Sequence, residues 1–379
     1  MLSLTLTLFA CAKTPEIVLD DSATFDSTGS DAGSDDAGAG DAGATDDTGT
    51  ASDPEDYRVL RGAILAGGEA ADVQIAGGRI TAVGAPDTLE GEVVDVSGRW
   101  LAPAFIDSHV HLAYLDDRDG MLDGGVAAAV DMAAPTTFFV ADLSPMTLLM
   151  SGPMVTGIGG YPTQSWGANG YGLECADADA AVAAVEELAG LGAGLIKIPR
   201  TGSNDLSVSA MEAAVEAAHA LGLKVASHAT SGDLAAEALS ADLLAHTPTG
   251  SMSASIVEAW GARAVVSTLD AFGGTSTTVE NLRQLREAGA TVLYGTDFGN
   301  TRNAGIDPEE IALLMEAGLD GAAILAAGTA TPADYWGLDT LGAIEPGRDA
   351  SFLVLSADPI ADAMALTKPV QVWIQGEVR

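Results

Sequence analysis

The sequence predicts an α/β protein whose largest part is a (β/α)8 TIM barrel. Between about residues 100 and 330, short apolar segments alternate with alanine-rich segments that carry apolar residues at helical spacing. Strands that alternate with helices pair in parallel, and eight such units favour a closed barrel. An open doubly wound sheet is the main alternative, but no glycine-rich phosphate-binding motif follows the first predicted strand.

Eight apolar segments are predicted to be strands because they are short and bounded by turn residues. They comprise residues 101–106, 126–131, 154–158, 194–198, 223–227, 242–246, 263–267 and 290–296. Helices are predicted between several of them, at residues 179–189, 209–221, 232–239 and 278–288. In a barrel of this kind the C-terminal ends of the strands meet at one mouth, where the active site lies.

The segments on either side of the predicted barrel have a different pattern. Residues 57–100 contain short apolar runs broken by Gly67-Gly68 and Gly77-Gly78, which is typical of strands joined by hairpin turns. Residues 340–379 show the same pattern. We therefore predict a small β-sandwich domain built from residues 57–100 and 340–379, with the catalytic barrel, residues 101–339, inserted between them.

Residues 1–11 are predicted to be a signal peptide. Their apolar run is shorter than the ~20 residues that span a bilayer, and it ends with Leu8-Phe9-Ala10-Cys11. This ending resembles the bacterial lipoprotein box, although no lysine or arginine precedes the run. We expect an exported protein of the cell envelope, attached to a bacterial membrane only through a lipid anchor at Cys11.

Residues 12–56 are predicted to be a disordered acidic linker. They hold 13 acidic side chains and one lysine, about a third of the net charge of −38, and few large apolar residues. The rest of the chain is also acidic, which argues against nucleic-acid partners and against electrostatic binding to anionic lipid. Cys11 and Cys175 are the only cysteines, so no disulfide framework is expected.

His109 and His111 are the most informative residues of the sequence. They follow an apolar run, and residues two apart on a strand project from the same face, ~6.6 Å apart along it. Two imidazoles placed in this way can bind one metal ion. The alternative is a pair of surface histidines in a loop. The chain has only five histidines, and His228 and His246 also end apolar runs, which favours a metal site.

Lys197 and Asp297 extend this predicted site. Lys197 stands inside an apolar strand, where a charged ammonium is costly unless the side chain reaches the rim of the barrel. Burial lowers a lysine pKa, and a neutral amine can react with carbon dioxide to give a carbamate that bridges two metal ions. Asp297 ends the eighth strand with a carboxylate able to bind a metal and carry a proton. His219 lies inside a predicted helix and is expected to be structural.

These positions resemble the pattern of the amidohydrolase superfamily. In that pattern, HxH follows the first strand, a lysine the fourth, histidines the fifth and sixth, and an aspartate the eighth. Residues 102–109 are similar to the family motif aPGfiDxHxH, and residues 328–333 and 342–351 resemble its C-terminal motifs. The resemblance covers about residues 57–379 and is greatest for the imidazolonepropionase-like group, which includes prolidase-type dipeptidases. Ser351 replaces the usual aspartate, and Tyr161 follows Gly159-Gly160 where many relatives have histidine.

The resemblance implies a metal-dependent hydrolase of amide, cyclic amide or dipeptide C–N bonds with two divalent ions. Zinc is the first expectation, with manganese, iron and cobalt as alternatives. One ion would be bound by His109, His111 and Asp297, and the other by His228 and His246. A carbamate on Lys197 and a hydroxide would bridge the ions, and Asp297 would pass the hydroxide's proton to the leaving nitrogen.

Loops after the predicted strands supply candidate substrate contacts. These are Tyr114, Arg118, Tyr161, Trp166, Arg200 and Arg302. Three arginines at one mouth of so acidic a protein favour a small substrate that carries a carboxylate. A lactonase or phosphotriesterase on the same site is a second interpretation, and a noncatalytic surface lipoprotein that binds a ligand is a third. The complete ligand set disfavours the third, and a homo-oligomer is left open.

Overall fold

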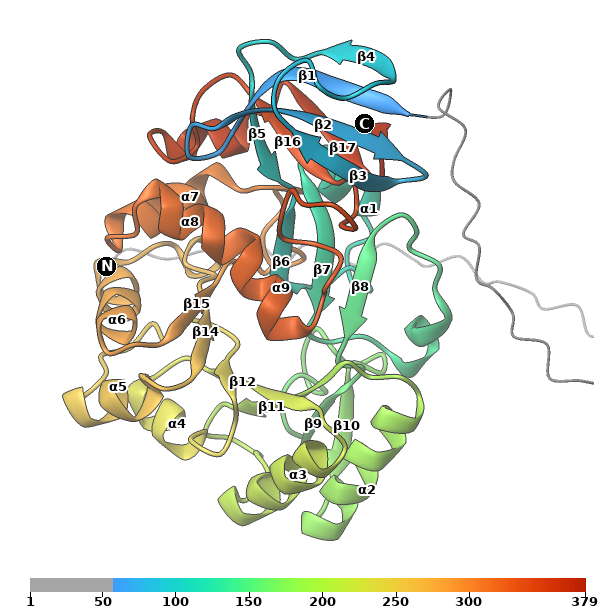
Figure 1. Ribbon diagram of the computed structural model, residues 1–379. Coiled ribbons are helices and arrows are strands. Elements are labelled where there is room, and N and C mark those ends of the chain that lie inside the picture. Colours follow the sequence, from blue (N-terminus) through green and yellow to red (C-terminus); the bar gives the residue numbers. More distant parts are fainter. Residues whose placement is uncertain (1–56) are drawn as a thin grey trace, which may run out of the picture. The chain divides into compact units, whose positions relative to one another are not determined.

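The computed structural model describes residues 57–379. The predicted signal peptide, the lipid anchor at Cys11 and the acidic linker lie outside the described residues. The described part is an α/β protein with one large mixed sheet, smaller parallel sheets and helices that follow the parallel strands (Figure 1). Within it, no helix combines the length and the apolar character needed to cross a membrane.

The largest sheet combines strands from distant parts of the sequence. Its strands are β1 (Arg58–Leu65), β2 (Ala70–Ala76), β3 (Arg79–Gly84), β4 (Glu92–Asp95), β5 (Trp100–Pro103), β16 (Phe352–Leu355), β17 (Gln371–Ile374) and β18 (Glu377–Val378). They follow the order β18-β17-β16-β5-β1-β2-β3, and β4 pairs with β1. The turn between β2 and β3 contains Gly77 and Gly78 at φ 56° and 77°, a conformation that costs glycine little.

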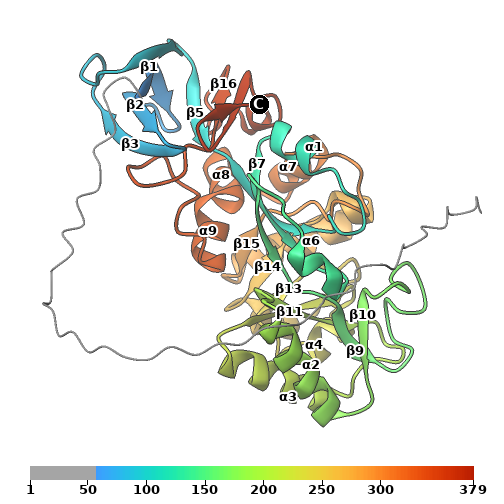
Figure 2. The same cartoon turned by 90° about the vertical axis from the view of Figure 1, so that its right-hand side faces the viewer.

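The sequence predicted that both flanking segments form one β-domain. The described strands from both segments indeed share a sheet, in which Leu101 of β5 pairs with Val354 of β16. In Figure 2, the strands β1, β2 and β3 lie at one end of the described fold, and the helices α2 (Ala178–Gly190) and α3 (Val208–Ala220) lie at the other. The arrangement as a sandwich, and the domain boundaries, stay predictions.

The parallel strands form three further sheets. The first contains β6 (Phe105–Val110), β7 (Val126–Asp131) and β8 (Thr147–Met150), and the second contains β9 (Met154–Gly157) and β10 (Gly172–Cys175). The third contains β11 (Leu195–Arg200), β12 (Lys224–Ala229), β13 (Leu243–Leu244), β14 (Ala264–Val266) and β15 (Thr291–Leu293), in that order. Among the described residues these sheets do not join into one closed barrel, so the α/β class is confirmed and the closed barrel is not.

The predicted strand at residues 101–106 is wrong, because the structure divides this run between two sheets. β5 ends at Pro103, which has no N–H to donate to a continuing ladder. The next residue, Ala104, donates its N–H to Ser351 O at 3.1 Å, and β6 begins at Phe105. His109 therefore lies inside β6, and His111 follows the strand directly.

The prediction also missed β8 and β10. Every residue of β8 is partly exposed, and β10 contains Gly172 and the exposed Glu174, so neither has the apolar character of a buried strand. Such short strands form because a neighbour offers a paired edge: β8 pairs with β7, and β10 pairs with β9.

Nine α-helices are found among residues 57–379, together with short 3-10 helices at Thr136–Val140, Asp270–Phe272 and Ala363–Thr367. Besides α2 and α3 the α-helices are α1 (Arg118–Asp123), α4 (Gly232–Glu237), α5 (Ala254–Trp260), α6 (Ser276–Glu287), α7 (Pro308–Glu316), α8 (Gly321–Gly328) and α9 (Ala330–Trp336). Side-chain caps fix several N-termini: Asp177 accepts from Ala180 N, Ser207 from Ala210 N, and Asp307 from Glu309 N and Glu310 N. The helices bury alanine, valine and leucine against the strands, which leaves the strand ends free to carry polar side chains.

Candidate metal centre

Five of the six predicted metal ligands lie near or beyond the C-terminal ends of parallel strands, and Lys197 lies in the middle of β11. His109 belongs to β6 and His111 follows it directly, Lys197 belongs to β11, His228 belongs to β12, His246 follows β13, and Asp297 follows β15. Backbone hydrogen bonds connect the first of these segments with the last: Asp297 N donates to His109 O, and His111 N donates to Phe298 O.

Three of these side chains meet at short distances. The Nε2 atoms of His109 and His111 are 3.3 Å apart. Asp297 Oδ1 lies 3.5 Å from His109 Nε2 and 3.3 Å from His111 Nε2. One carboxylate oxygen and two imidazole nitrogens therefore form a small triangle.

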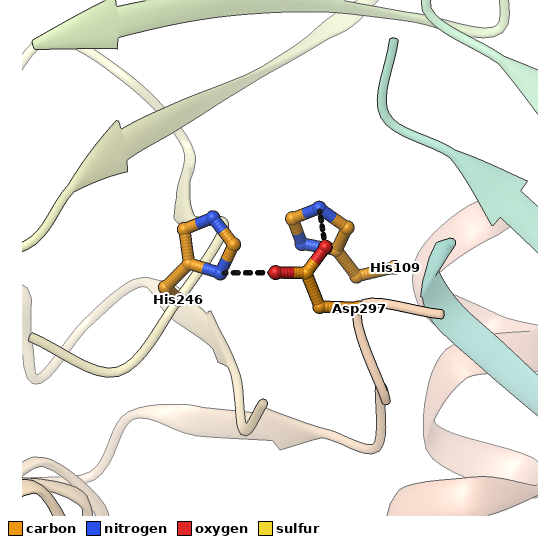
Figure 3. A group of neighbouring side chains, drawn as sticks. All are labelled: His109, His246 and Asp297. Carbon is orange, nitrogen blue, oxygen red and sulfur yellow. Dashed lines mark ion pairs between the residues drawn. The ribbon is translucent and has the colours of Figure 1, made fainter. Parts of the chain in front are cut away.

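His246 approaches the same carboxylate from the other side. Its Nδ1 lies 4.0 Å from Asp297 Oδ2, and ligand atoms of His109, His246 and Asp297 all lie within 4.8 Å of one another. Figure 3 shows one oxygen of the Asp297 carboxylate facing His109 and the other facing His246. The rings of His109 and His246 also contact each other, with centroids 4.5 Å apart, and His228 packs edge-on against His246, with ring centroids 4.8 Å apart. The four histidines and Asp297 therefore form one contiguous cluster.

Burial keeps His109, His228 and His246 neutral. It lowers the pKa values of His109 and His246 well below the ordinary value, and it lowers the pKa of His228 to about 3. His109 Nδ1 lies 2.8 Å from Ala245 O and must donate, because a carbonyl oxygen only accepts. The Nε2 atom of His109 therefore directs a lone pair toward Asp297, as a metal ligand requires.

The backbone holds Asp297 in an unusual conformation. Its φ is 53°, a region that non-glycine residues rarely occupy, and such strain is concentrated at functional sites. Burial by itself would raise the pKa of this carboxyl. The electrostatic interactions of this carboxyl with His109, His111 and Lys197 outweigh burial and lower its pKa to about 2. The side chain is therefore an anion at neutral pH.

Lys197 is fully buried in β11, and its Nζ has no hydrogen-bond partner among the described residues. Burial lowers the pKa of this amine to about 7, although the charges of Asp297 and Asp131 act in the opposite direction. A substantial fraction of the amine is therefore uncharged at neutral pH. Buried polar atoms in folded proteins nearly always have a partner, so this orphaned amine requires an explanation.

The donor set fits a divalent metal ion. Ligand atoms placed ~2.0–2.1 Å from a tetrahedral zinc ion are ~3.3–3.4 Å from one another, close to the separations within the His109–His111–Asp297 triangle. Two imidazole lone pairs and a carboxylate that face one another at this distance repel, and a cation between them removes the repulsion. Asp297 Oδ1 and His111 Nδ1 are also buried without a hydrogen-bond partner among the described residues.

A protein-family comparison agrees with this geometry. The model described as "Amidohydrolase family" matches residues 100–379. The chain belongs to the amidohydrolase family. As a member it is an amidohydrolase, and the superfamily is metal-dependent.

Two curated relatives of this amidohydrolase are enzymes that act on C–N bonds. The chain is 29% identical to an adenine deaminase of Deinococcus deserti over 301 residues, which are 75% of this chain and 53% of the relative. It is 40% identical to a dihydroorotase of Streptomyces coelicolor over 92 residues, 22% of each protein. The chain therefore spans about half the length of the first relative and less of the second.

Solved structures show the same fold at low sequence identity. A Xaa-Pro dipeptidase with bound methionine in its active site has a TM-score of 0.71 at 18% identity, over 85% of this chain and 99% of that one. A prolidase complexed with N-methylphosphonate-L-proline has a TM-score of 0.71 at 21% identity, with the same coverage. Phenylurea hydrolase B has a TM-score of 0.69 at 18% identity, over 85% and 96%. These similarities establish the fold alone.

A cavity of about 270 Å³ opens onto the amidohydrolase centre. Five of the six predicted ligands line it: His111, Lys197, His228, His246 and Asp297. Of the candidate substrate contacts, Tyr114, Tyr161, Trp166 and Arg302 line it as well. The sequence did not point to Met154, Phe272, Gly299 and Asn300, which also line the cavity and belong to no recognisable motif.

Arg118 and Arg200 do not line the cavity, which corrects the expectation of three arginines at its mouth. Arg118 donates to Ser144 O at 3.3 Å. Arg200 is buried, donates to Leu206 O and forms an ion pair with Glu237. These arginines are engaged in local contacts, whereas Arg302 is exposed and has no ion pair within the described chain. One arginine is therefore available to a substrate.

His219 and Asp242 lie outside the centre. His219 belongs to α3, and its Nε2 lies 2.9 Å from a carboxylate oxygen of Asp242. The same carboxylate accepts from Val225 N at 2.7 Å, so it connects a helix to the start of a strand. Both residues have the structural role that the sequence indicated for His219.

Asp107 is a supporting residue that the sequence analysis did not identify. It is fully buried in β6, where its Oδ1 accepts from His109 N at 3.0 Å and Thr296 N at 3.1 Å. Its Oδ2 accepts from Thr296 Oγ1 at 2.6 Å. Burial raises the pKa of Asp107 to about 7, even though these hydrogen bonds lower it. Asp107 thus connects the backbone of His109 to the residue that precedes Asp297.

We predict that Thr296→Val destabilises the protein by about 1–3 kcal/mol, because it leaves a buried oxygen of Asp107 without its closest donor. Valine has nearly the same shape as threonine, so the core volume is preserved. Urea unfolding measures the change. Thr291→Val, at an exposed position of β15, is the matched control and should stay within about 0.5 kcal/mol of the unaltered protein. Equal stabilities of the two variants would show that the hydrogen bond between Thr296 and Asp107 does not stabilise the protein.

Proposed function

We propose that this amidohydrolase hydrolyses amide-type C–N bonds of small substrates at a centre for two divalent metal ions. The observation that carries the proposal is the triangle of His109, His111 and Asp297 at ligand-to-ligand distances, beside an orphaned buried lysine. These three residues would hold one ion, and His228 and His246 the other. Zinc suits this nitrogen and oxygen donor set, and manganese, iron and cobalt are alternatives.

Lys197 is proposed to act as a carbamate between the two sets of ligands. Its uncharged amine can add to carbon dioxide, and the resulting anion would have oxygens to offer to both ions. The support comes from its complete burial, its missing hydrogen-bond partner and its pKa of about 7. The addition would release one proton to solvent and leave one negative charge on the Lys197 side chain.

Asp297 is proposed to move the proton. When bound, the ions lower the pKa of a water molecule and polarise a carbonyl group. Asp297 is ionised and lies among the ligands, so one of its oxygens can accept the proton of the attacking water and return it to the leaving nitrogen. The hydrogen bond from Asn300 Nδ2 to Asp297 Oδ2, at 3.3 Å, orients the carboxylate for this transfer.

The cavity favours a small substrate with an apolar part and an anionic end. Tyr114, Tyr161, Trp166 and Phe272 give its wall an aromatic character, and Arg302 can pair with a carboxylate. A dipeptide or an N-acyl amino acid has both features. The named activities of the relatives, an adenine deaminase, a Xaa-Pro dipeptidase and phenylurea hydrolase B, all break C–N bonds, which supports the reaction class.

We also propose that the three parallel sheets are parts of one barrel. Ser108 N donates to Tyr294 O at 2.9 Å, which connects β6 with the segment after β15. Gly194 N donates to Met150 O at 2.9 Å, which connects β8 with the start of β11. The solved structures with TM-scores near 0.7 support this proposal.

For localisation we propose export and lipid attachment through Cys11, on the basis of the sequence alone. Removal of residues 1–56 should then release the protein from membranes and leave turnover unchanged, because no residue of the centre precedes His109. Membrane fractionation and activity assays of the full and shortened chains measure both effects. Loss of activity in the shortened chain would show that the removed segment supports the catalytic part.

Asp297→Asn should retain much of the metal, because an amide oxygen can still bind a cation, but lose about 10²–10⁴-fold in turnover, the usual contribution of acid–base catalysis. The control is Asp242→Asn, which alters the partly exposed contact between Asp242 and His219 and should keep near-normal turnover. Metal analysis and steady-state kinetics on a dipeptide and N-acyl amino acid panel separate these outcomes. Normal turnover of Asp297→Asn would exclude it as the proton carrier.

Lys197→Ala should bind less zinc and lose hydrolysis. If the carbamate forms, metal-free protein should recover more zinc when bicarbonate is supplied than in buffer depleted of carbon dioxide, and Lys197→Ala should not respond to bicarbonate. Lys224→Ala, whose ammonium lies over the Tyr335 ring away from the centre, is the control and should respond normally. Full zinc content and turnover in Lys197→Arg would contradict the carbamate.

A further inference from the structure

The loop between β9 and β10 places two aromatic side chains over the candidate metal centre. The Tyr161 ring stacks on His228, with ring centroids 5.0 Å apart and an angle of 26° between the planes. The Trp166 ring lies against His111, with centroids 5.2 Å apart. The two aromatic residues thus contact histidines from the two proposed ion sites, and both line the cavity.

A hydrogen bond joins this aromatic pair. Trp166 Nε1 lies 2.8 Å from Tyr161 Oη. An indole N–H can only donate, so the phenol oxygen is the acceptor. The phenol hydrogen is therefore not used in this bond, and no acceptor for it is found among the hydrogen bonds of the described residues.

The phenol group is held firmly and keeps its proton. Stacking on His228 fixes the ring plane, and the Trp166 N–H fixes the position of the oxygen. Burial raises the pKa of Tyr161 to about 12, and the charge of Asp297 adds to the increase. Tyr161 and Asp297 both line the cavity.

We propose that Tyr161 donates a hydrogen bond to the carbonyl oxygen of the amide substrate and to the oxyanion that replaces it when water adds. This inference rests on the proposed C–N hydrolysis. The proton stays on the phenol oxygen, so Tyr161 itself neither forms nor breaks a covalent bond, and the proton of the attacking water still passes through Asp297. The bond from Trp166 withdraws electron density from the Tyr161 oxygen and makes its O–H a stronger donor. Trp166 is therefore a positioning residue and Tyr161 a catalytic one.

This role accounts for a departure noted in the sequence. Tyr161 follows Gly159-Gly160 at the place where many relatives have histidine. The Tyr161 oxygen accepts from Trp166 of the same loop, so a phenol with an unused hydrogen occupies this place in the cavity wall. The loop itself is fixed to the segment that follows β6, because Tyr171 Oη donates to Ala113 O at 2.7 Å.

The test compares Tyr161→Phe with the unaltered protein on an amide substrate and on its thioamide. Phenylalanine keeps the ring on His228 and removes only the hydroxyl. Loss of one oxyanion donor should lower kcat on the amide by ~10²-fold, with KM nearly unchanged. Sulfur accepts hydrogen bonds weakly, so the loss on the thioamide should be clearly smaller. Equal losses on both substrates, or an effect on KM alone, would overturn the proposal.

Tyr171→Phe is the control for loop order. It removes a hydroxyl hydrogen bond from the same loop but does not alter a residue that lines the cavity. Its kcat should stay near normal, and its losses on the amide and the thioamide should be the same. If Tyr171→Phe reproduced the substrate-dependent loss of Tyr161→Phe, the hydroxyl of Tyr161 would act only by ordering the loop, and the proposal would be wrong.

A binding experiment separates this proposal from the proposed hydrolysis. Methylphosphonate is a small tetrahedral oxyanion, and calorimetry on zinc-loaded protein should show tighter binding to the unaltered protein than to Tyr161→Phe by ~10-fold, the value of about one hydrogen bond to a charged group. If the protein hydrolyses amides but Tyr161→Phe changes neither turnover nor methylphosphonate affinity, the proposed function stands and the role of Tyr161 as a donor is wrong. If Tyr161→Phe weakens methylphosphonate binding but the protein hydrolyses no amide, Tyr161 is a donor to oxyanions and the proposed function is wrong.

Discussion

The burial of Lys197 beside Asp297 and neutral histidines is the constraint on which the rest of the structure depends. A buried charge without partners is strongly unfavourable, and these groups sit where apolar strands surround them on nearly every side. The side chains cannot stabilise this arrangement alone, since two imidazole nitrogens and a carboxylate oxygen approach within 3.5 Å. The free energy of folding must therefore come from the alanine-, valine- and leucine-rich packing of the strands and helices. Part of that free energy offsets the unfavourable contacts in the centre.

Backbone contacts carry the position of Asp297. Its own N–H is tied to His109 O, and the neighbouring Thr296 is tied to the buried Asp107 by two hydrogen bonds. Thr268 shows a second unusual backbone, at φ 41°, and its hydroxyl lies 3.2 Å from His246 Nδ1. Strained residues persist only where the surrounding structure determines them fully. The centre is thus fixed in advance of any ligand, which is the condition for electrostatic catalysis.

The sequence predicted the α/β class and the family because rare ionisable residues inside apolar strands are an unambiguous signal. His109, His246 and Asp297 form the candidate metal group that this signal indicated. Local patterns could not show that residues 101–106 divide between two sheets, since the division depends on pairing with β16. They also could not show where Arg118 and Arg200 point, because a long side chain turns to the nearest acceptor. The hydrogen bonds that Asp107 accepts from His109 and Thr296 could not be predicted, because in the sequence Asp107 is simply one residue of the histidine motif.

The pairing of β5 with β16 has a consequence for the order of synthesis. Leu101 lies opposite Val354, so strands made early find their central partner only after most of the chain has left the ribosome. Until then β5 has an open edge directly joined to the strand that carries His109 and His111. Such long-range pairing slows folding and exposes strand edges. The nascent protein therefore passes through a stage in which the ligand-bearing strand is made but its neighbouring sheet is incomplete, and this stage is where association between chains is most favoured.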